Sequence, residues 1–310
     1  MRREGREDAR ITVVQGNSYL IPHTSYLRKL RIILEMIKFE HTVFALPFAL
    51  TSAVVAADGL PAWRTLGWVL AAMVGARSAA MAFNRIADLR HDAENPRTKD
   101  RALPKGLVSV TEAWAFVIAS IALFVLAAAM LNRLALALSP AALAVILGYS
   151  YTKRFTSWSH LILGLCLGIA PVGAWIAVKG QFDLPPVVLA ACVMLWTAGF
   201  DIIYSLQDIE FDRRAGLLSL PRSLGPARAL LVSRLMHVLM VGGLIWFGAI
   251  AGMGTIYYVG LAVASSFIAY EHSLVSPKDL SRVNTAFFTM NGFVSVGLFA
   301  FAFVDVVVGG

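Results

Sequence analysis

Residues 112–131 read EAWAFVIASIALFVLAAAML, an almost uninterrupted apolar run with one charged residue at its start. A helix needs about 20 apolar residues in a row to cross the hydrocarbon core of a bilayer, so this run predicts a membrane-spanning helix. We predict nine such spans, at residues 34–57, 65–87, 112–131, 136–151, 161–178, 186–206, 229–251, 256–270 and 285–308. The sequence therefore predicts an all-α polytopic membrane protein, with nine transmembrane helices in one bundle around a central cavity that opens to the cytoplasmic side.

The composition of the whole chain agrees with this class. Of 310 residues, 58% are hydrophobic and 15% are charged, whereas soluble globular chains carry about 25% charged residues. This excludes a disordered chain, a fibrous repeat and an ordinary cytosolic domain. We expect the lipid bilayer, and no nucleic acid, as a partner. Both cysteines, Cys166 and Cys192, lie inside apolar runs, which predicts buried thiols and no disulfide framework.

Basic residues are concentrated at one end of the predicted spans. Of the 27 Lys and Arg residues, 23 fall in the N-terminal segment or around the loops after the second, fourth, sixth and eighth spans. The opposite loops hold 3, and Arg77 lies inside the second span. Because basic loops stay in the cytoplasm, we expect a cytoplasmic N-terminus and an external C-terminus. Residues 1–25 are predicted to be a mobile cytosolic tail, and residues 26–310 a single transmembrane domain.

The second predicted span runs into the sequence NRIADLRHD, residues 84–92, which continues past the end of the span at residue 87. On a helix with about 100° per residue, Asn84, Asp88 and Asp92 fall within about 80° of one another. Arg77 lies on the same stripe two turns earlier. One face of this helix is therefore predicted to carry a cation, a carboxamide and two carboxylates.

The sixth predicted span ends in a second acidic stretch, DIIYSLQDIEFD, residues 201–212. Asp201, Asp208 and Asp212 fall within about 40° of one another on a helix, with Tyr204 about 60° to one side. A single stripe of this kind is typical of an exposed helix end. Two stripes at the same end of the bundle indicate a site, because ionisable groups drawn into a membrane are costly.

Carboxylates in this arrangement suit a hard divalent cation. Mg²⁺ takes oxygen ligands and is typically held by one or two carboxylates together with substrate phosphates. Two facing stripes would hold more than one ion, and a diphosphate bridging the ions would become a better leaving group as its charge is neutralised.

Two basic segments lie next to the acidic stripes. Residues 95–106 read NPRTKDRALPKG and residues 149–154 read YSYTKR. Their cations would bind phosphate oxygens above the metal ions. A topogenic loop, or the preference of cations for a helix C-terminus, would account for the same residues, so these interpretations stay open.

These motifs resemble those of the UbiA superfamily of intramembrane prenyltransferases. The resemblance rests on N-x-x-x-D-x-x-x-D at 84–92, R-T-x-x-R-x-L-P-x-G at 97–106 and D-x-x-Y-x-x-x-D-x-x-x-D at 201–212. It extends over all nine predicted spans, and the two acidic motifs with their loops in this order are highly specific. Two positions depart from the family pattern, because Arg85 replaces an acid and Ala102 replaces a proline.

The resemblance implies roles for individual residues. Four aspartates would be catalytic, and with Asn84 they would bind Mg²⁺ and the diphosphate of a polyprenyl donor: Asp88, Asp92, Asp208 and Asp212. The substrate-binding residues would be Arg77, Asn84, Lys99, Arg101, Tyr149, Lys153, Arg154, Asp201 and Tyr204. In aromatic-acid members of the family, the arginine that Arg77 matches lies beside the acceptor carboxylate.

Residues 204–214, YSLQDIEFDRR, look most like the 4-hydroxybenzoate polyprenyltransferase-like branch. We therefore expect Mg²⁺-dependent transfer of a polyprenyl group to an aromatic acid, with 4-hydroxybenzoate favoured, for ubiquinone or menaquinone biosynthesis in a bacterial cytoplasmic (inner) membrane. A naphthoate, a haem and a chlorophyllide are alternative acceptors. A secondary transporter with Asp201 and Arg77 as an ion relay is disfavoured, because transporter sites lie near the bilayer midplane and these acids crowd one surface.

Overall fold

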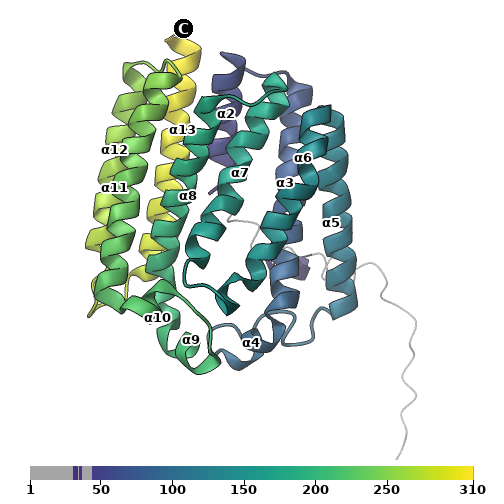
Figure 1. Cartoon of the computed structure of the whole chain (residues 1–310), viewed down its shortest axis with the longest axis vertical. Coiled ribbons are helices and arrows are strands. Elements are labelled where there is room, and N and C mark those ends of the chain that lie inside the picture. Colours follow the sequence, from purple (N-terminus) through teal and green to yellow (C-terminus); the bar gives the residue numbers. More distant parts are fainter. Residues whose placement is uncertain (1–30, 34, 37–43, 310) are drawn as a thin grey trace, which may run out of the picture.

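The computed structural model describes residues 31–33, 35–36 and 44–309, and the predicted tail at residues 1–25 lies outside them. The described residues form helices joined by loops (Figure 1). In chain order these are α2 (Leu46–Ala57), α3 (Trp63–Ala87), α4 (Leu89–Glu94), α5 (Val110–Leu131), α6 (Arg133–Gly148), η2 (Tyr149–Arg154), α7 (Ser159–Lys179), α8 (Leu184–Ser205), η3 (Leu206–Asp208), α9 (Ile209–Ala215), α10 (Leu220–Leu224), α11 (Pro226–Ile250), α12 (Thr255–Ser273), η4 (Thr285–Met290) and α13 (Asn291–Val308). Among these, η2 and η3 are 3-10 helices and η4 is a π-helix. The described part of the chain has no β-strand, and one isolated bridge joins Ser276 to Asp279.

Seven helical segments within the described residues are long and apolar enough to cross a membrane. They are Trp63–Ala87, Val110–Leu131, Arg133–Arg154, Ser159–Lys179, Leu184–Ala215, Pro226–Ile250 and Thr285–Val308. The first predicted span is described only in part, as the 12 residues of α2, and α12 is not among the seven. The all-α prediction is confirmed, whereas the count of nine spans and the side to which the cavity opens stay predictions.

Local hydrogen bonds fix where α5 and α6 begin. Ser109 and Glu112 form a capping box, in which each side chain accepts a hydrogen bond from the backbone N–H of the other. Asn132 caps α6 by accepting from the N–H of Ala135, and its amide also donates to the carbonyl of Ile176 at 2.7 Å. The same asparagine therefore starts α6 and ties it to the end of α7.

Small residues allow two pairs of helices to touch backbone to backbone. A Cβ atom at Gly164 or Gly168 of α7 would collide with backbone atoms of α8, and the first of these contacts is to the carbonyl of Met194. On α3, a Cβ at Gly75 would lie 2.8 Å from the backbone nitrogen of Phe124 in α5. Close approach through small residues is a principal way in which helices associate in lipid. The pairs α3/α5 and α7/α8 are therefore closely packed units of the bundle.

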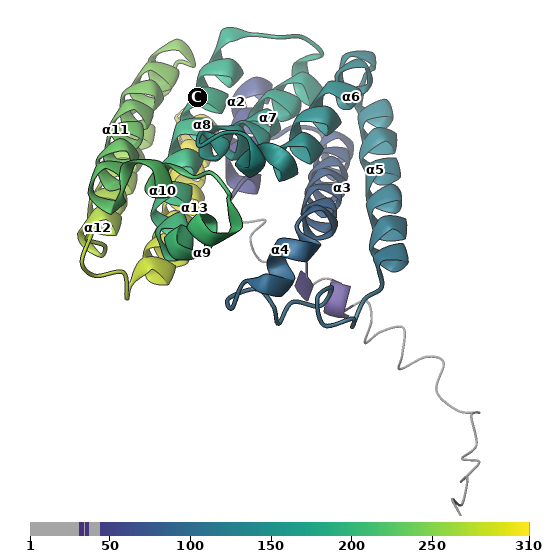
Figure 2. The ribbon, with the colours of Figure 1, turned by 60° about the horizontal axis from the view of Figure 1, so that its bottom comes forward.

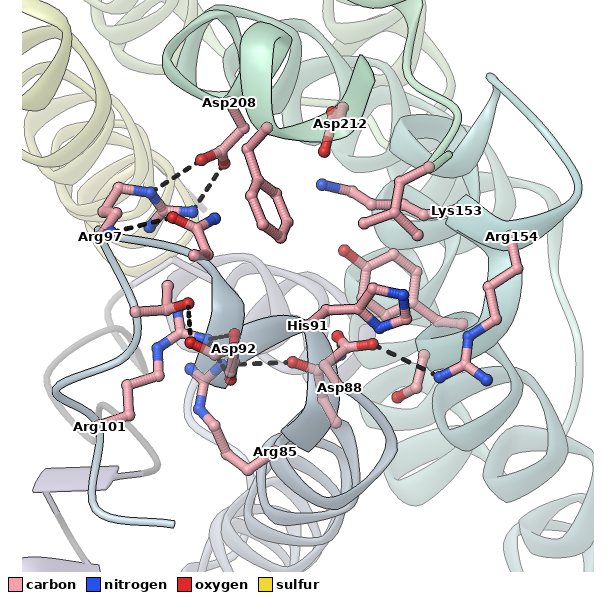
Figure 3. A pocket seen from close by; sticks show the side chains of 17 residues that line it. Arg85, Asp88, His91, Asp92, Arg97, Arg101, Lys153, Arg154, Asp208 and Asp212 are labelled. Carbon is pink, nitrogen blue, oxygen red and sulfur yellow. Dashed lines mark hydrogen bonds and ion pairs between the residues drawn. The ribbon is translucent and has the colours of Figure 1, made fainter. Parts of the chain in front are cut away.

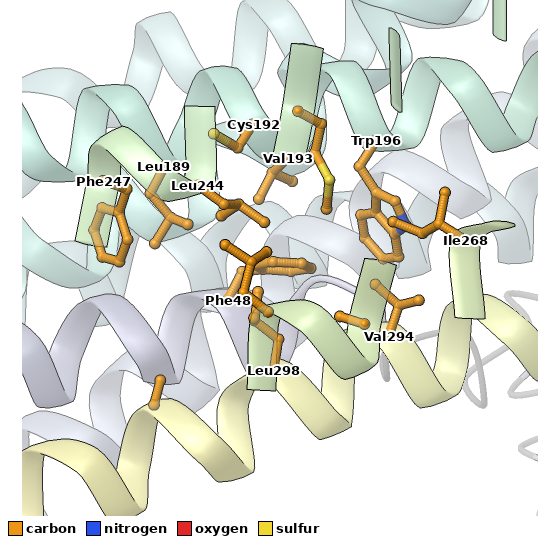
Figure 4. Close-up of a cluster of buried hydrophobic side chains, with 14 of the residues drawn as sticks. Phe48, Leu189, Cys192, Val193, Trp196, Leu244, Phe247, Ile268, Val294 and Leu298 are labelled. Atoms are coloured by element: carbon orange, nitrogen blue, oxygen red, sulfur yellow. The ribbon is translucent and has the colours of Figure 1, made fainter. Parts of the chain in front are cut away.

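The main hydrophobic core lies around α8. Figure 4 shows side chains of α2, α8, α11, α12 and α13 converging there. Its labelled residues are Phe48, Leu189, Cys192, Val193, Trp196, Leu244, Phe247, Ile268, Val294 and Leu298. Because lipid tails are as apolar as these side chains, packing rather than exclusion from water holds the helices together here.

The polar segments gather at one end of the bundle. Figure 1 shows α4, α9 and α10 at the end away from the C-terminus, and Figure 2 shows the same end turned forward. Since α4 follows α3 and α9 follows α8, this arrangement brings the two acidic motifs to the same end of the bundle.

Candidate active site

Both acidic motifs are broken by a short irregularity at an aspartate. α3 ends at Ala87 and α4 begins at Leu89, with Asp88 between them at φ −97° and ψ 7°. Asp208 closes the 3-10 turn η3 before α9, with φ −102° and ψ 2°. The spans predicted at 65–87 and 186–206 thus end within a residue of the ends of α3 and α8, and the helical spacing assumed for the two stripes is interrupted at Asp88 and at η3. Aspartate disfavours helix interiors, and these values lie in the sparsely allowed bridge region, where active-site residues are often found.

The two motifs line one pocket, of about 150 Å³, at the polar end of the bundle (Figure 3). Residues from both halves of the chain face it. Its charged and hydrogen-bonding side chains include Asn84, Arg85, Asp88, His91, Asp92, Arg97, Arg101, Tyr149, Lys153, Arg154, Asp208 and Asp212. Such a pocket concentrates four carboxylates and several cations in a small volume.

Asp88 is held by a carboxamide and one cation. The amide of Asn84 donates to Asp88 Oδ2 at 2.9 Å, and Arg154 Nη2 lies 3.8 Å from Asp88 Oδ1. Burial, followed by the negative charge of Asp92, raises the pKa of Asp88 above its ordinary value of 3.8, although Lys153 and Arg154 oppose the shift. At Asp88, burial and the charge of Asp92 therefore outweigh the two nearby cations.

Asp92 is neutralised from within the first half of the chain. Arg101 Nη1 donates to both of its carboxylate oxygens at 2.7 Å. Arg85 Nη1 lies 4.0 Å away, and Arg85 is itself buried, with its Nε donating to the carbonyl of Met36. Arg85, one of the two residues that depart from the family pattern, therefore lies beside Asp92 in the pocket lining.

Arg97 links the two halves of the site. Its Nε and Nη2 donate to the two oxygens of Asp208 at 3.0 and 2.7 Å, a bidentate pair. Its Nη1 donates to the hydroxyl of Tyr204 at 3.3 Å, and its guanidinium lies 5.5 Å from the centre of that ring. Burial alone would lower the pKa of Arg97, but the bond and charge of Asp208 outweigh it and raise the pKa. Sequence reasoning placed Arg97 in a basic loop and missed this contact.

Residues 218–220, which follow α9, make three hydrogen bonds to residues in or next to the site. Ser219 Oγ donates to Asp212 Oδ2 at 2.8 Å, and the N–H of Leu218 donates to the carbonyl of Lys153 at 2.7 Å. The N–H of Leu220 donates to His160 Nε2 at 3.4 Å. These contacts hold Asp212 in the wall of the pocket, opposite the first motif (Figure 3).

Asp201 is bound by a buried histidine. His160, which has no exposed surface, lies with Nδ1 2.7 Å from Asp201 Oδ2. Because the other ring nitrogen accepts from the backbone of Leu220, Nδ1 carries the proton and donates to the carboxylate. Sequence reasoning did not find this contact, because no spacing in the sequence pairs positions 160 and 201.

The predicted site residues divide into two groups. The pocket brings together Asn84, Asp88, Asp92, Arg101, Tyr149, Lys153, Arg154, Asp208 and Asp212. Four predicted substrate-binding residues do not line it: Arg77, Lys99, Asp201 and Tyr204. Of these, Tyr204 contacts the lining through Arg97, and Lys99 is exposed to solvent.

The donor set of the pocket suits a hard cation. Four carboxylates and the Asn84 carboxamide offer oxygen ligands of the kind Mg²⁺ prefers. Within the described residues, no three acidic, histidine or cysteine side chains are yet grouped closely enough to hold an ion. Instead, Arg97 and Arg101 neutralise one carboxylate of each motif. The residues present fit Mg²⁺ by their chemistry.

Comparison with known proteins gives a consistent result. The UbiA prenyltransferase family matches residues 45–293. A 4-hydroxybenzoate octaprenyltransferase from Xanthomonas euvesicatoria pv. vesicatoria is 34% identical over 257 residues, which cover 83% of this chain and 84% of the relative. The enzyme of the same name from Nitrosospira multiformis is 31% identical over 254 residues, covering 82% and 87% of the two chains.

Solved structures show the same fold. The apo structure of a UbiA homologue from Aeropyrum pernix K1 has a TM-score of 0.79 and 40% identity, covering 86% of this chain and 98% of its own. A UbiA homologue from Archaeoglobus fulgidus bound to DMAPP and Mg²⁺ has a TM-score of 0.69 and 20% identity, covering 88% and 98%. The chain therefore belongs to the UbiA prenyltransferase family, and it is a prenyltransferase.

Proposed function

We propose that this protein catalyses Mg²⁺-dependent transfer of a polyprenyl group from polyprenyl diphosphate to an aromatic acid, 4-hydroxybenzoate, in the biosynthesis of ubiquinone or menaquinone. One observation carries the proposal: two acidic motifs from different halves of the chain line a single pocket that also holds Arg97, Arg101, Lys153 and Arg154. The names of its relatives, 4-hydroxybenzoate octaprenyltransferases, support the choice of acceptor.

The polar end of the pocket would bind the diphosphate. The four aspartates and Asn84 would hold Mg²⁺, which neutralises the charge that builds up on the departing pyrophosphate. Lys153 and Arg154, on η2, face the same space and would contact phosphate oxygens directly. Arg97 and Arg101 are bound to carboxylates and would share them with the incoming ion and diphosphate.

The reaction would be an electrophilic aromatic substitution. The allylic C–O bond breaks, pyrophosphate leaves with the electron pair, and a ring carbon of the acceptor attacks the cation. The ring then loses a proton to a carboxylate or to pyrophosphate. The apolar helix faces beneath the pocket would exclude water, which otherwise captures the cation as an alcohol.

Arg77 would hold the carboxylate of the acceptor. It lies on α3, seven residues before Asn84 of the pocket lining, so it is roughly 10 Å deeper in the bundle. Its side chain is only partly exposed. A cation at that depth would orient the acceptor ring towards the allylic end of the donor.

The reaction can be tested on the purified full chain in detergent. Farnesyl diphosphate with 4-hydroxybenzoate should give pyrophosphate and a prenylated acid when Mg²⁺ is present, and neither product when EDTA replaces it. The same assay with a naphthoate, a haem and a chlorophyllide compares the alternative acceptors. No Mg²⁺-dependent pyrophosphate with any acceptor would overturn the proposal, and product from another acceptor alone would replace 4-hydroxybenzoate.

The same function implies a place in the cell. We propose one transmembrane domain, residues 26–310, in a bacterial inner membrane, with the N-terminus and the pocket on the cytoplasmic side and the C-terminus outside. The bias of basic residues supports this orientation. Single cysteines at the exposed positions Lys105 and Arg64 provide the test. An impermeant maleimide added to intact cells should label Arg64→Cys and spare Lys105→Cys, and the opposite pattern would overturn the orientation.

A further inference from the structure

A single π-helical turn, η4 (Thr285–Met290), begins the last membrane segment. Such turns are rare, and they lie frequently at functional sites because they leave backbone carbonyls without their ordinary partner and rotate the side chains that follow. Here two carbonyls of the turn accept hydrogen bonds from the side chain of the residue that follows it. Asn291 Nδ2 donates to the carbonyl oxygens of Ala286 and Phe287, both at 3.2 Å.

Asn291 is held in turn by two other helices. Trp196 Nε1 on α8 donates to Asn291 Oδ1 at 2.7 Å, and Glu271 Oε1 on α12 accepts from Asn291 Nδ2 at 3.1 Å. All three residues are 0% exposed. A buried amide that uses both of its ends on partners from α8 and α12 has its rotamer fixed, so the π-turn is fixed with it.

The π-turn places two aromatic rings beside the second acidic motif. Phe287 lies 4.3 Å from Tyr204 between ring centres, and the ring of Phe288 is 4.7 Å from that of Phe287. Tyr204 bears the hydroxyl that Arg97 contacts, and Arg97 pairs with Asp208. A continuous path therefore runs from Asn291 through the aromatic rings to the pocket.

We propose that Asn291, clamped by Trp196 and Glu271, is a positioning residue that sets Phe287 and Phe288 as an aromatic wall for the allylic cation formed beside Tyr204. The inference rests on the proposed function, because it needs a cation to form there. Aromatic faces attract cations through the ring quadrupole, and a fixed wall also keeps water from the allylic carbon. If the wall loosens, water captures more of the cation, giving prenyl alcohol and a proton in place of prenylated acid.

The test compares transfer with alcohol formation in the detergent-purified full chain, given farnesyl diphosphate, Mg²⁺ and 4-hydroxybenzoate. Asn291→Leu should lower the ratio of prenylated acid to farnesol about fivefold and lower kcat, with little change in the donor KM, because the diphosphate contacts are intact. Phe287→Leu should lower the same ratio. Since Asn291 acts through Phe287, the double variant should lower it no further than the larger single effect.

Two variants separate positioning from general loss of packing. Glu271→Gln keeps an acceptor for the Asn291 amide and should retain the wild-type ratio. Tyr257→Phe removes another fully buried hydrogen bond, from Tyr257 to the carbonyl of Leu244, and should lower Tm without changing the ratio. A wild-type ratio in Asn291→Leu, or full additivity in the double variant, would overturn the proposal.

The test still decides if a variant fails to fold or if the wild-type chain is inactive. If Asn291→Leu does not fold, Phe287→Leu and Phe288→Leu carry the test, and a wild-type ratio in both overturns the aromatic wall. If the wild-type chain itself releases no pyrophosphate, the proposed function fails and this inference fails with it. Wild-type activity with an unchanged ratio in the variants removes this inference alone.

Discussion

Asp88 and Asp208 occupy equivalent places in the two halves of the chain, yet they differ in what neutralises them. Asp88 joins α3 to α4, Asp208 ends the 3-10 turn that joins α8 to α9, and the two take almost the same backbone angles. Asp208 has a bidentate arginine, Arg97, whereas Asp88 accepts from the Asn84 amide and has a cation at 3.8 Å, with Lys153 as a further positive charge nearby.

The arginine of the second motif is supplied by the first half of the chain. The loop after α4 sends Arg101 back to Asp92 and Arg97 across to Asp208. The loop after α9 makes no such crossing to the first motif and binds its own Asp212 through Ser219. Two similar motifs thus become one asymmetric site, in which a single loop controls charge on both sides.

The largest expected effect comes from removing one carboxylate charge in either motif. Asp88→Asn and Asp208→Asn should each lower kcat/KM by about a thousandfold in a folded protein, because both carboxylates would hold Mg²⁺ and diphosphate. Pyrophosphate release measures the loss, and gel filtration checks the fold. Near wild-type turnover in one variant would show that the two motifs are not equivalent in catalysis.

A smaller effect should distinguish Arg97, which crosses to the second motif, from Lys99 in the same loop. Arg97→Gln should raise the donor KM about tenfold or more, since a charged hydrogen bond to phosphate is lost. Lys99 lies in the same loop but outside the pocket lining, so Lys99→Gln should change the donor KM by less than about threefold. Initial rates at varied farnesyl diphosphate measure both, and an equal rise would contradict the special place of Arg97.

Arg77→Ala sharpens the comparison by testing the other substrate. The acceptor KM should rise about tenfold as the contact with its carboxylate is lost, while the donor KM stays near the wild-type value. Initial rates at varied 4-hydroxybenzoate and a fixed donor concentration give the acceptor KM. If both KM values rise together, Arg77 supports the fold of α3 and does not select the acceptor.

The smallest expected effect is on stability, and it differs in sign between the motifs. The raised pKa of Asp88 means that the folded state binds its proton more tightly than the unfolded state. Stability therefore falls as pH rises from the ordinary value of 3.8 through the folded pKa, and the ionised carboxylate is destabilising at pH 7. Without Mg²⁺, Asp88→Asn should raise Tm at pH 7 by about 2 °C.

Asp208→Asn should instead lower Tm under the same conditions, because Arg97 loses its bidentate partner. The advantage of Asp88→Asn should fade as the pH is lowered below 3.8, where the wild-type carboxyl is protonated in both states. Thermal unfolding in detergent across this pH range gives both results. Shifts of the same sign would mean that the two aspartates are neutralised to a similar degree.

The sequence predicted the helices well where hydrophobic length alone decides them. The run at residues 112–131 became Val110–Leu131, extended by the Ser109 capping box. The ends of the two long helices were predicted within a residue, at 87 and 206, but the short helices beyond them were not, because neither glycine nor proline marks the breaks at Asp88 and Asp208. The short helices α4 and α9 follow those breaks, and the pattern of helical spacing continues through both without interruption.

Contacts between segments far apart in the chain were the second feature that the sequence did not predict. Local spacing groups Asp88 with Asp92 and Asp208 with Asp212, which line the same pocket, whereas Asp201 of the second motif lies outside that lining. The pairing of Arg97 with Asp208 spans 111 residues, and that of His160 with Asp201 spans 41. Such pairs depend on how the helices assemble, and a charge pattern in one chain does not specify them.

The glycine contacts between α7 and α8, and between α3 and α5, limit where the isoprenoid chain of the donor could enter the bundle from the lipid bilayer. Helices whose backbones touch cannot separate without losing contact along their length. Each pair therefore moves as a rigid unit. A long isoprenoid chain must therefore pass between such helix pairs and cannot pass between the two helices of one pair. We therefore expect an isoprenoid chain to enter from the lipid where one of these helix pairs meets its neighbours, and a bulkier side chain there should restrict the length of chain accepted.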